Sequence, residues 1–592
     1  MTIKIYKCMK KISKILSAVI LICGISLSAC SDMLNVDLDN KVATEDHNLN
    51  SANDSLYSVL GILQQVQYLG ERYVILGELR ADLMDLTTNS DRDLIDIYFN
   101  INLDNESNPY LSTREYYSVI NNCNYFINRV DTTIWSGGPS EYIMQREYAV
   151  VKAIRAWVYW QLALNYGKVP YITQPILTIA DMNKDYPVYD INGIADELIK
   201  DLTPYEFTEY PYYANSGAAI GGYRPSYSFI PVSFLLGDLY LWKGGEQNLE
   251  KAAQHYHNLI STSYTGNYRP DPTRISYELL RRATNWYRDP DVTTSNTISI
   301  GGDWINTFRA GNLAGDVYAV ISGGSAEEYF NMPNLVRLPM SGQAYQYKVA
   351  PSLVAMYNWE TAPYIYYDSS TRDTLYRRGD IRGWNSGYAG SYTFQPTATG
   401  GRIPYINKYS SNNAYIYRLP TLYLRFAEAV NRLGKPSVAL AVLKNGLSES
   451  RMENPNIVNL SEVENKPSYL DFSFIPSSTN ESFLIGVRSR GGGNAQYDTV
   501  HLVFNPEIHL NLQDSINFVE TLILEELALE TAFEGNRFHD LMRFAKRSGN
   551  SAILTDRVRM KNPTAAANLA NEDNWFLPSK YNIPNLVEEQ QP

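Results

Sequence analysis

Recognisable catalytic and metal-binding motifs are missing from this 592-residue sequence. It contains no H-E-x-x-H, G-x-S-x-G, P-loop or G-x-G-x-x-G motif. The six histidines are scattered, and His255 and His257 would point to opposite sides of a helix, which makes them a poor metal pair. We therefore expect no metal and no cofactor. A glycoside hydrolase stays open, because its two carboxylates need no local sequence pattern.

Cysteine and positive charge are both scarce. Of the four cysteines, Cys8 and Cys23 fall in a removable N-terminal segment and Cys30 ends it, so only Cys123 belongs to the body. An intramolecular disulfide is then excluded, and a hydrophobic core must supply the stability. The 51 basic residues stand against 63 acidic ones, a net charge of −12. An acidic chain argues against nucleic-acid binding and against peripheral attachment to anionic lipid.

The N-terminal segment has the pattern of a lipoprotein signal peptide, residues 1–29. Five lysines precede an apolar run, Ile15 to Leu27, that is short for a membrane-spanning helix. The run ends in Leu-Ser-Ala-Cys, which resembles a bacterial lipobox in which Cys30 is acylated. Residues 30–53 are polar and acidic, so we expect a lipidated tether. The alternative is a plain secretory signal with a chance cysteine.

Helical periodicity dominates the body except in its middle. Ala149 to Tyr166 carries one wide apolar stripe, which predicts a buried helix. Tyr223 to Ile260 and Leu419 to Leu447 each approximate half of a tetratricopeptide pattern, with small residues between two helices. Such hairpins cannot bury their faces alone, so they should stack. We predict a mostly α fold built from irregular tetratricopeptide-type helical hairpins.

Residues 286–411 do not follow this periodicity. They are rich in Gly, Ser, Tyr, Asn and Thr, and they form a loop-rich insertion longer than a connection needs. Aromatic faces can cover the apolar face of a sugar ring while amides and charges bind its hydroxyls, so we expect the ligand surface here. The alternative is that these aromatics pack loops onto the helices. The candidate contacts are Trp286, Tyr287, Trp304, Tyr345, Tyr347, Trp359 and Trp384.

Two carboxylates fall on the apolar side of a helix predicted from Phe518 to Phe533. Glu526 and Glu530 lie inside its apolar arc, where a carboxylate is costly unless a cation meets it. The favoured interpretation is a structural clamp that fixes this helix against a short helix beginning at Asn536. The alternative makes the two glutamates an acid/base pair. The expected clamp residues are Glu526, Glu530, Arg537, Asp540 and Arg543.

The same stretch resembles a known family. The pattern E-x-x-x-E-x-x-F-E-G-N-R-x-x-D-L-x-R, which ends at Arg543, resembles the C-terminal signature of SusD/RagB proteins, although Leu527 replaces the usual Arg. Further similar landmarks are the Asp-x-Arg at Asp380, the Lys-Tyr at Lys408 and the tail from Phe576. These proteins are surface lipoproteins of the Bacteroidetes that bind nutrients, usually glycans, beside a TonB-dependent outer-membrane transporter.

The resemblance implies both a fold and a function. It implies one SusD-like body over residues 54–592, comprising a helical part (54–285), the insertion (286–411) and the signature region (412–592). The protein would lie on the cell surface, anchored in the outer membrane through its lipid, and pass an oligosaccharide to a SusC-like TonB-dependent transporter without catalysis. Family similarity places Gly77 to Asp82 near the ligand, which adds Arg80 and Asp82 as candidates, although an ordinary helix end is the alternative. A RagB-like peptide binder, a surface glycoside hydrolase and a purely structural adaptor are the other hypotheses.

Overall fold

The structure is a computed structural model that describes most of the chain from Leu49 to Pro578. In the strands at 285–288, 297–300, 363–368, 373–378, 395–396 and 495–496 it describes the backbone only. The described residues are 49, 52–105, 107–134, 144–215, 224–264, 285–288, 297–300, 308, 317–322, 347–368, 373–378, 380, 382–383, 390–396, 401–409, 413–444, 446–475, 484–487, 495–496 and 502–578.

Helices make up most of this body, which confirms the predicted mostly α fold. Those before the insertion are α2 (Ala52–Gln67), α3 (Gly70–Glu78), α4 (Arg92–Phe99), α5 (Arg114–Arg129), α6 (Gln145–Tyr166), α7 (Ile179–Met182), α8 (Ile191–Leu202), α9 (Val232–Lys243) and α10 (Glu246–Tyr264). The later ones are α13 (Leu353–Thr361), α14 (Leu419–Arg432), α15 (Pro436–Lys444), α16 (Glu449–Met452), α17 (Leu512–Glu530), α18 (Arg537–Ser548), α19 (Ala552–Lys561) and α20 (Pro563–Asn568).

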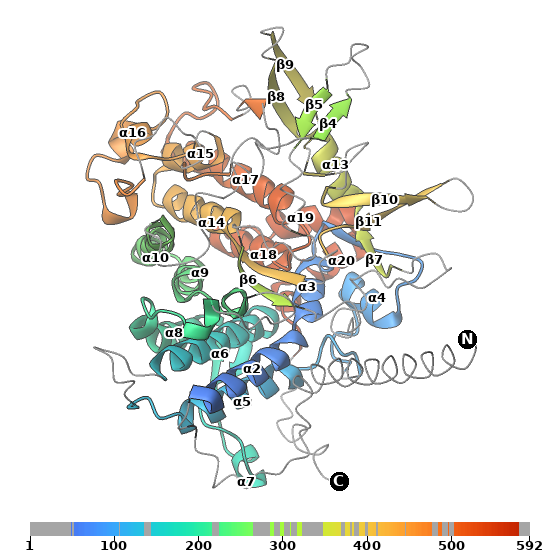
Figure 1. Ribbon diagram of the computed structural model, residues 1–592. Coiled ribbons are helices and arrows are strands. Elements are labelled where there is room, and N and C mark those ends of the chain that lie inside the picture. The colour runs from blue at the N-terminus through green and yellow to red at the C-terminus, as the bar shows by residue number, and fades with distance from the viewer. Residues whose placement is uncertain are drawn as a thin grey trace, which may run out of the picture.

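The helices pack as neighbouring hairpins, as Figure 1 shows. Helix α5 packs on α6, α9 on α10, and α14 on α15, while α8 bridges α6 to α9 and α10 packs on α14. Helix α6 is buried from Ala149 to Tyr166 except at Lys152, because α2, α5 and α8 all pack against it. A helix with apolar side chains on several faces suits such a position. The tetratricopeptide-type detail of these hairpins stays a prediction.

Short antiparallel strands pair within this body, and some of the pairs join distant parts of the chain. The pairs are β1–β7, β2–β3, β4–β5, β6–β12, β10–β11 and the three-stranded β13–β8–β9. Within the insertion, β8–β9 and β10–β11 form hairpins and α13 forms a helix, none of which the periodicity indicated. The strands are β1 (Met84–Leu86), β2 (Lys168–Pro170), β3 (Val188–Asp190), β4 (Asn285–Arg288), β5 (Thr297–Ile300), β6 (Val317–Ser322), β7 (Val349–Pro351), β8 (Pro363–Asp368), β9 (Asp373–Arg378), β10 (Tyr392–Pro396), β11 (Arg402–Ile406), β12 (Asn413–Arg418) and β13 (Ala495–Gln496).

The turn between α17 and α18 is held by a carboxylate from the other end of the chain. Helix α17 ends at Glu530 and not at Phe533, because Phe533 adopts a positive φ of 68°. Glu78 of α3 accepts the backbone N–H groups of Phe533, Gly535, Asn536 and Arg537 at 2.8–3.4 Å. A carboxylate at a helix N-terminus satisfies amides that have no partner within the helix. Glu78 thereby fixes α3 against the start of α18.

Candidate functional site

The insertion is fastened to the helical body by a buried arginine. Arg382 is 1 % exposed, and it directs its guanidinium at three carboxylates. Its Nη1 donates to Glu526 Oε1 at 2.7 Å and to Glu530 Oε2 at 2.6 Å. Its Nε and Nη2 donate to Asp380 at 2.7–3.2 Å. Arg382 therefore joins the chain of the insertion to the inner face of α17.

Two more cations approach α17 from the end of the insertion and from β12. Arg418 donates to Glu530 Oε1 at 3.0 Å and to the Glu534 carboxylate at 2.8 Å. Lys408 Nζ donates to the Glu530 carbonyl oxygen at 2.8 Å and also pairs with the Glu534 carboxylate. We call the set Asp380, Arg382, Lys408, Arg418, Glu526, Glu530 and Glu534 the ionic root. Every member is buried, so the charges compensate one another within the protein.

The electrostatics of the ionic root favour a structural role for its glutamates. Burial alone would raise the pKa of Glu530, but Arg418, Arg382 and Lys408 lower it to about 2. Burial lowers the pKa of Lys408, and the nearby Glu534 only partly opposes this. A carboxylate that stays ionised at neutral pH has no proton to donate, and a buried pair admits no sugar. The acid/base alternative for Glu526 and Glu530 is therefore wrong.

The five expected clamp residues all lie in buried ion pairs, but their partners differ from the prediction. Arg537 does not meet the two glutamates of α17. It pairs with Asp82 through two contacts of 2.8 Å and donates to the Leu524 carbonyl at 3.0 Å. Arg543 pairs with Glu428 of α14 and with Asp540 at 2.7–2.9 Å. The arginines of α18 thus face α14 and the segment between α3 and β1. Arg382 and Arg418 contact the two glutamates of α17 instead.

Arg80 and Asp82 are not at a ligand surface, which corrects that expectation. Both are about 1 % exposed. Arg80 donates to Asn100 Oδ1 at 3.0–3.1 Å and to the Trp575 carbonyl at 2.9 Å, and it lies over the Phe538 ring. Burial lowers the pKa of its guanidinium to about 9. Asp82 is bound to Arg537, so Arg80 and Asp82 fix the segment after α3 against α18 and offer no free face to a ligand.

Trp359 is also a core residue and not a ligand contact. It is 2 % exposed, and its Nε1 donates to the Leu529 carbonyl at 3.2 Å. Its ring packs at 5.8 Å from that of Phe533 and at 5.6 Å from that of Tyr392. A side chain enclosed in this way offers no face to a sugar ring. Trp359 instead anchors α13 of the insertion beside the ionic root.

The remaining aromatic candidates divide into three groups. Tyr347 is 9 % exposed, and its ring stacks on that of Tyr405 at 4.9 Å and 3°, so Tyr405 covers one of its faces. Trp286 and Tyr287 lie on β4, and their side chains are outside the description. Trp304, Tyr345 and Trp384 lie outside the described residues. Exposed apolar side chains on the described part of the insertion include Leu353, Tyr357 and Ile403.

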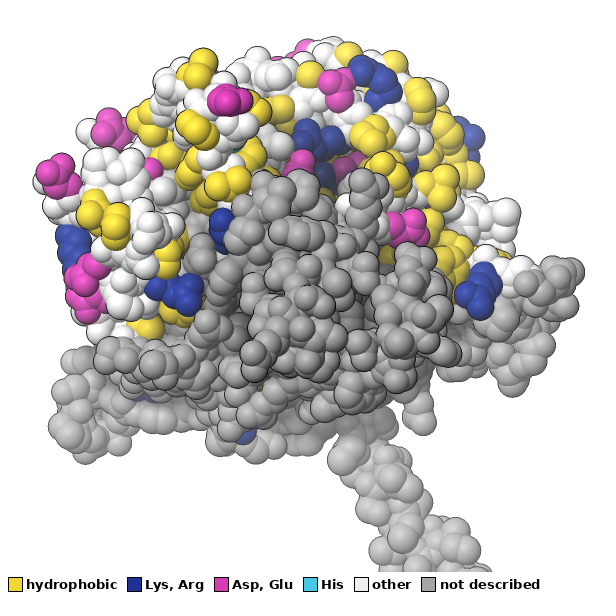
Figure 2. All heavy atoms as spheres, turned by 90° about the horizontal axis from the view of Figure 1, so that it is seen from above, with side chains coloured by type: hydrophobic (Ala, Val, Ile, Leu, Met, Phe, Trp, Pro, Cys, Tyr) yellow, Lys and Arg dark blue, Asp and Glu magenta, His cyan; other side chains and the backbone are white. Residues whose placement is uncertain are grey.

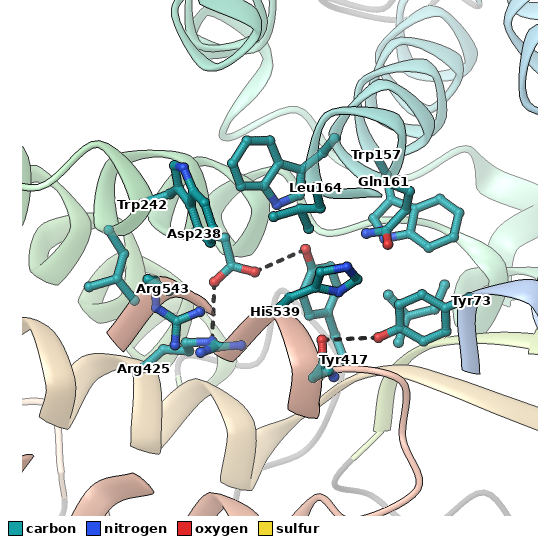
Figure 3. Close-up of a pocket in the computed structure, with 14 residues that line it drawn as sticks. Tyr73, Trp157, Gln161, Leu164, Asp238, Trp242, Tyr417, Arg425, His539 and Arg543 are labelled. Carbon is teal, nitrogen blue, oxygen red and sulfur yellow. Dashed lines mark hydrogen bonds and ion pairs between the residues drawn. The ribbon is translucent and has the colours of Figure 1, made fainter. Parts of the chain in front are cut away.

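A small polar cavity lies inside the body, between α6, α9, β12, α14 and α18 (Figure 3). Asp238 receives a hydrogen bond from Tyr417 and faces Arg425 at 3.7 Å, and Tyr73 donates to Asn536. The volume is about 30 Å³, which is the room of one or two water molecules. Burial lowers the pKa of the neighbouring His539 to about 3, so its ring is neutral. This cavity is too small for a sugar.

Sequence patterns alone leave the partners in the ionic root unresolved. Arg382 is 144 residues from Glu526, and Arg418 is 112 residues from Glu530. The sequence did point to these positions, because the Asp-x-Arg at Asp380 and the Lys-Tyr at Lys408 resemble motifs of the SusD/RagB family. The motifs do not indicate which residues they contact. Within the described residues no group of three or more His, Cys, Asp or Glu side chains is placed to hold a metal ion. No described helix combines the length and apolar character that a bilayer crossing requires.

Comparisons with known proteins identify the class of fold. No protein-family model matches the sequence, and no curated protein matches it significantly. A SusD superfamily protein from Bacteroides vulgatus ATCC 8482 matches with a TM-score of 0.56 and 15 % identity, over 90 % of this chain and 97 % of that chain. One from Bacteroides thetaiotaomicron VPI-5482 matches with a TM-score of 0.52 and 17 % identity, over 91 % and 97 %.

These matches define a helical scaffold of the same extent as the whole body described above. The chain has the fold of the SusD superfamily, as the C-terminal motif predicted. At such low identity the likeness concerns the fold, so the ligand and the partners are treated as proposals.

Proposed function

We propose that this protein is a cell-surface lipoprotein that captures an oligosaccharide and passes it to a SusC-like TonB-dependent transporter. The observation that carries the proposal is the ionic root, in which Arg382 holds the insertion against a rigid helical body. Binding loops on a fixed scaffold keep the geometry of a site without the entropy cost of ordering it on each encounter. The SusD-like fold supports a nutrient-binding role.

The proposed action is capture without catalysis. Glu526 and Glu530 are the carboxylate pair that the sequence suggested for acid/base chemistry, and both are engaged by Arg382. Cys123 is buried, and burial raises the pKa of its thiol to about 12, so it is a poor nucleophile. A surface glycoside hydrolase would need another carboxylate pair.

A glycan is the favoured ligand because the insertion is aromatic and rich in amides. The five candidates Trp286, Tyr287, Trp304, Tyr345 and Trp384 stay as proposed contacts, since their side chains are outside the description. The alternative ligand is a peptide, as in RagB-like uptake. The lipid on Cys30, the outer-membrane location and the transporter partner are proposed from the lipobox and from the resemblance.

Calorimetry on purified residues 31–592 tests the function. Glycan pools should release or absorb heat on binding, peptide pools should not, and no reducing ends should appear during incubation. Binding of peptides alone would favour the RagB-like alternative. Reducing ends that vanish on mutation of one carboxylate would contradict capture without catalysis.

Two tryptophan variants test the place of the site. Trp286→Ala and Trp304→Ala should each weaken glycan binding by about tenfold, because each removes a ring that can cover a sugar face. Tyr68→Ala is the control, since Tyr68 is an exposed aromatic outside the insertion. If both tryptophan variants bind like the parent, the site is not on these parts of the insertion.

A further inference from the structure

The polar cavity between α6, α9, β12, α14 and α18 contains hydrogen-bonding groups that the described part of the protein does not satisfy (Figure 3). Gln161 of α6 is 5 % exposed, and its side-chain oxygen accepts no hydrogen bond from any described residue. Figure 3 shows its amide directed from α6 toward the other labelled side chains. A buried amide oxygen without a donor loses the hydrogen bonds that water gives it in the unfolded chain.

A second unmet group lines the same cavity from α14. Arg425 is 4 % exposed, and its Nε donates to no acceptor among the described residues. The ion-pair partner of this atom, Asp238 Oδ1 of α9, lies 3.7 Å away. That separation is too long for a direct hydrogen bond, and a polar contact beyond about 3.5 Å is one that a water molecule can bridge.

The size and the charges of the cavity suit water better than an ion or an organic ligand. Its volume of about 30 Å³ exceeds the roughly 10–15 Å³ that one water needs, and it is far below the roughly 300 Å³ of the smallest usual ligand pockets. Asp238 and Arg425 bring opposite charges to the wall, and Arg543 is already paired with two carboxylates. The wall therefore favours neither a cation nor an anion.

Charged groups on the surface of the protein are satisfied differently. Figure 2 shows Lys, Arg, Asp and Glu side chains on the described part of the upper face, where bulk water can complete their hydrogen bonds. Gln161 and Arg425 are buried, so water held inside the body must do the same for them.

We propose that this cavity is a binding site for one or two structural water molecules, which join the Gln161 amide of α6 and the Arg425 guanidinium of α14 to the Asp238 carboxylate of α9. Such waters supply the missing partners through hydrogen bonds that are nearly as favourable as direct ones. They link two helices that precede the insertion to one that follows it. The inference does not rest on the proposed function, and the two fail separately, because its test needs no glycan.

A crystal structure of the protein, at a resolution that shows ordered water, tests the site directly. One or two water peaks should lie in the cavity, and at least one should be within about 3.2 Å of two of the three groups, Gln161, Asp238 and Arg425. Crystals soaked in bromide or in thallium(I) should show no anomalous peak there, because these ions replace chloride and monovalent cations. An absence of density, a peak that bridges none of these groups, or an anomalous peak would each overturn the proposal.

Magnetic relaxation dispersion of the water signal gives a second measure in solution, because it counts waters that stay buried for longer than the protein tumbles. Gln161→Met keeps the length of the side chain but removes the amide, so this variant should lose at least one long-lived water relative to the parent. Gln174→Met is the matched control, since Gln174 is exposed, and it should keep the parent's count. An unchanged count in Gln161→Met would overturn the proposal. If Gln161→Met does not fold, the crystal structure of the parent decides.

Discussion

Helices α6 and α17 are both buried in the body, but they are held by different forces. Helix α6 presents mainly apolar side chains, such as Ile154 and Trp157, to its neighbours, and its Arg155 also pairs with Asp201 of α8 at 2.7 Å. Helix α17 presents Glu526 and Glu530, which are stable only because Arg382 and Arg418 meet them. Burial of apolar area tolerates small changes of shape, whereas a buried charge requires its particular partner. The position of the insertion therefore depends on a few residues, and that of α6 on many.

Removal of Arg382 should have the largest effect. Arg382→Met leaves Asp380, Glu526 and Glu530 without a shared cation and should lower the free energy of unfolding by about 3–5 kcal/mol. Denaturant titration measures the loss. Arg382→Lys keeps the positive charge but loses the planar guanidinium group that donates to several carboxylates at once. It should therefore recover only part of the stability. A loss below about 1 kcal/mol in Arg382→Met would mean that the ionic root contributes little.

Acid should weaken the contacts of α17 with the ionic root. The folded pKa of Glu530 is about 2, below its ordinary value of 4.5, so the ionised form stabilises the fold. This contribution is fully present above pH 4.5 and is lost as the pH falls toward 2. The loss should reach about 3 kcal/mol of unfolding free energy.

The control for the acid effect is a variant that cannot titrate at this position. Glu530→Gln should be less stable at neutral pH, and its stability should fall less steeply between pH 4.5 and 2 than that of the parent. If the free energy of unfolding fell equally steeply with pH in both proteins, other carboxyl groups would be responsible for the loss of stability in acid.

The turn that follows α17 depends on a close backbone contact with α3. A Cβ added at Gly77 of α3 would lie 1.8 Å from the carbonyl oxygen of Gly535. Backbone cannot move aside as a flexible side chain can, so Gly77→Ala should cost about 1–3 kcal/mol of unfolding free energy. Gly61→Ala on α2 is the control, because a Cβ there meets nothing within 4 Å. Equal stability of the two variants would contradict the close approach.

The same contrast explains what the sequence could predict. Apolar spacing is a local signal, so it indicated α6, α14 and α15 near their observed positions. The burial of Glu526 and Glu530 followed from the same spacing, because both fall within the apolar arc of α17. Their partners did not follow, because Arg382 lies 144 residues away from Glu526 and comes into contact only through the fold. Trp359 was misassigned to the ligand surface for the same reason, since its contact with Leu529 is also long-range.

The smallest effect should come from the apolar helix. Ile154→Val removes one buried methylene from α6 and should cost about 1 kcal/mol of unfolding free energy. Since no charge is involved, the cost should be the same at pH 7 and at pH 4, in contrast to the Glu530 contribution. Denaturant titrations at both pH values measure it. A cost that changed strongly with pH would mean that the packing of Ile154 is coupled to a titrating group, either the Asp201 carboxyl that pairs with Arg155 of α6 or the ionic root.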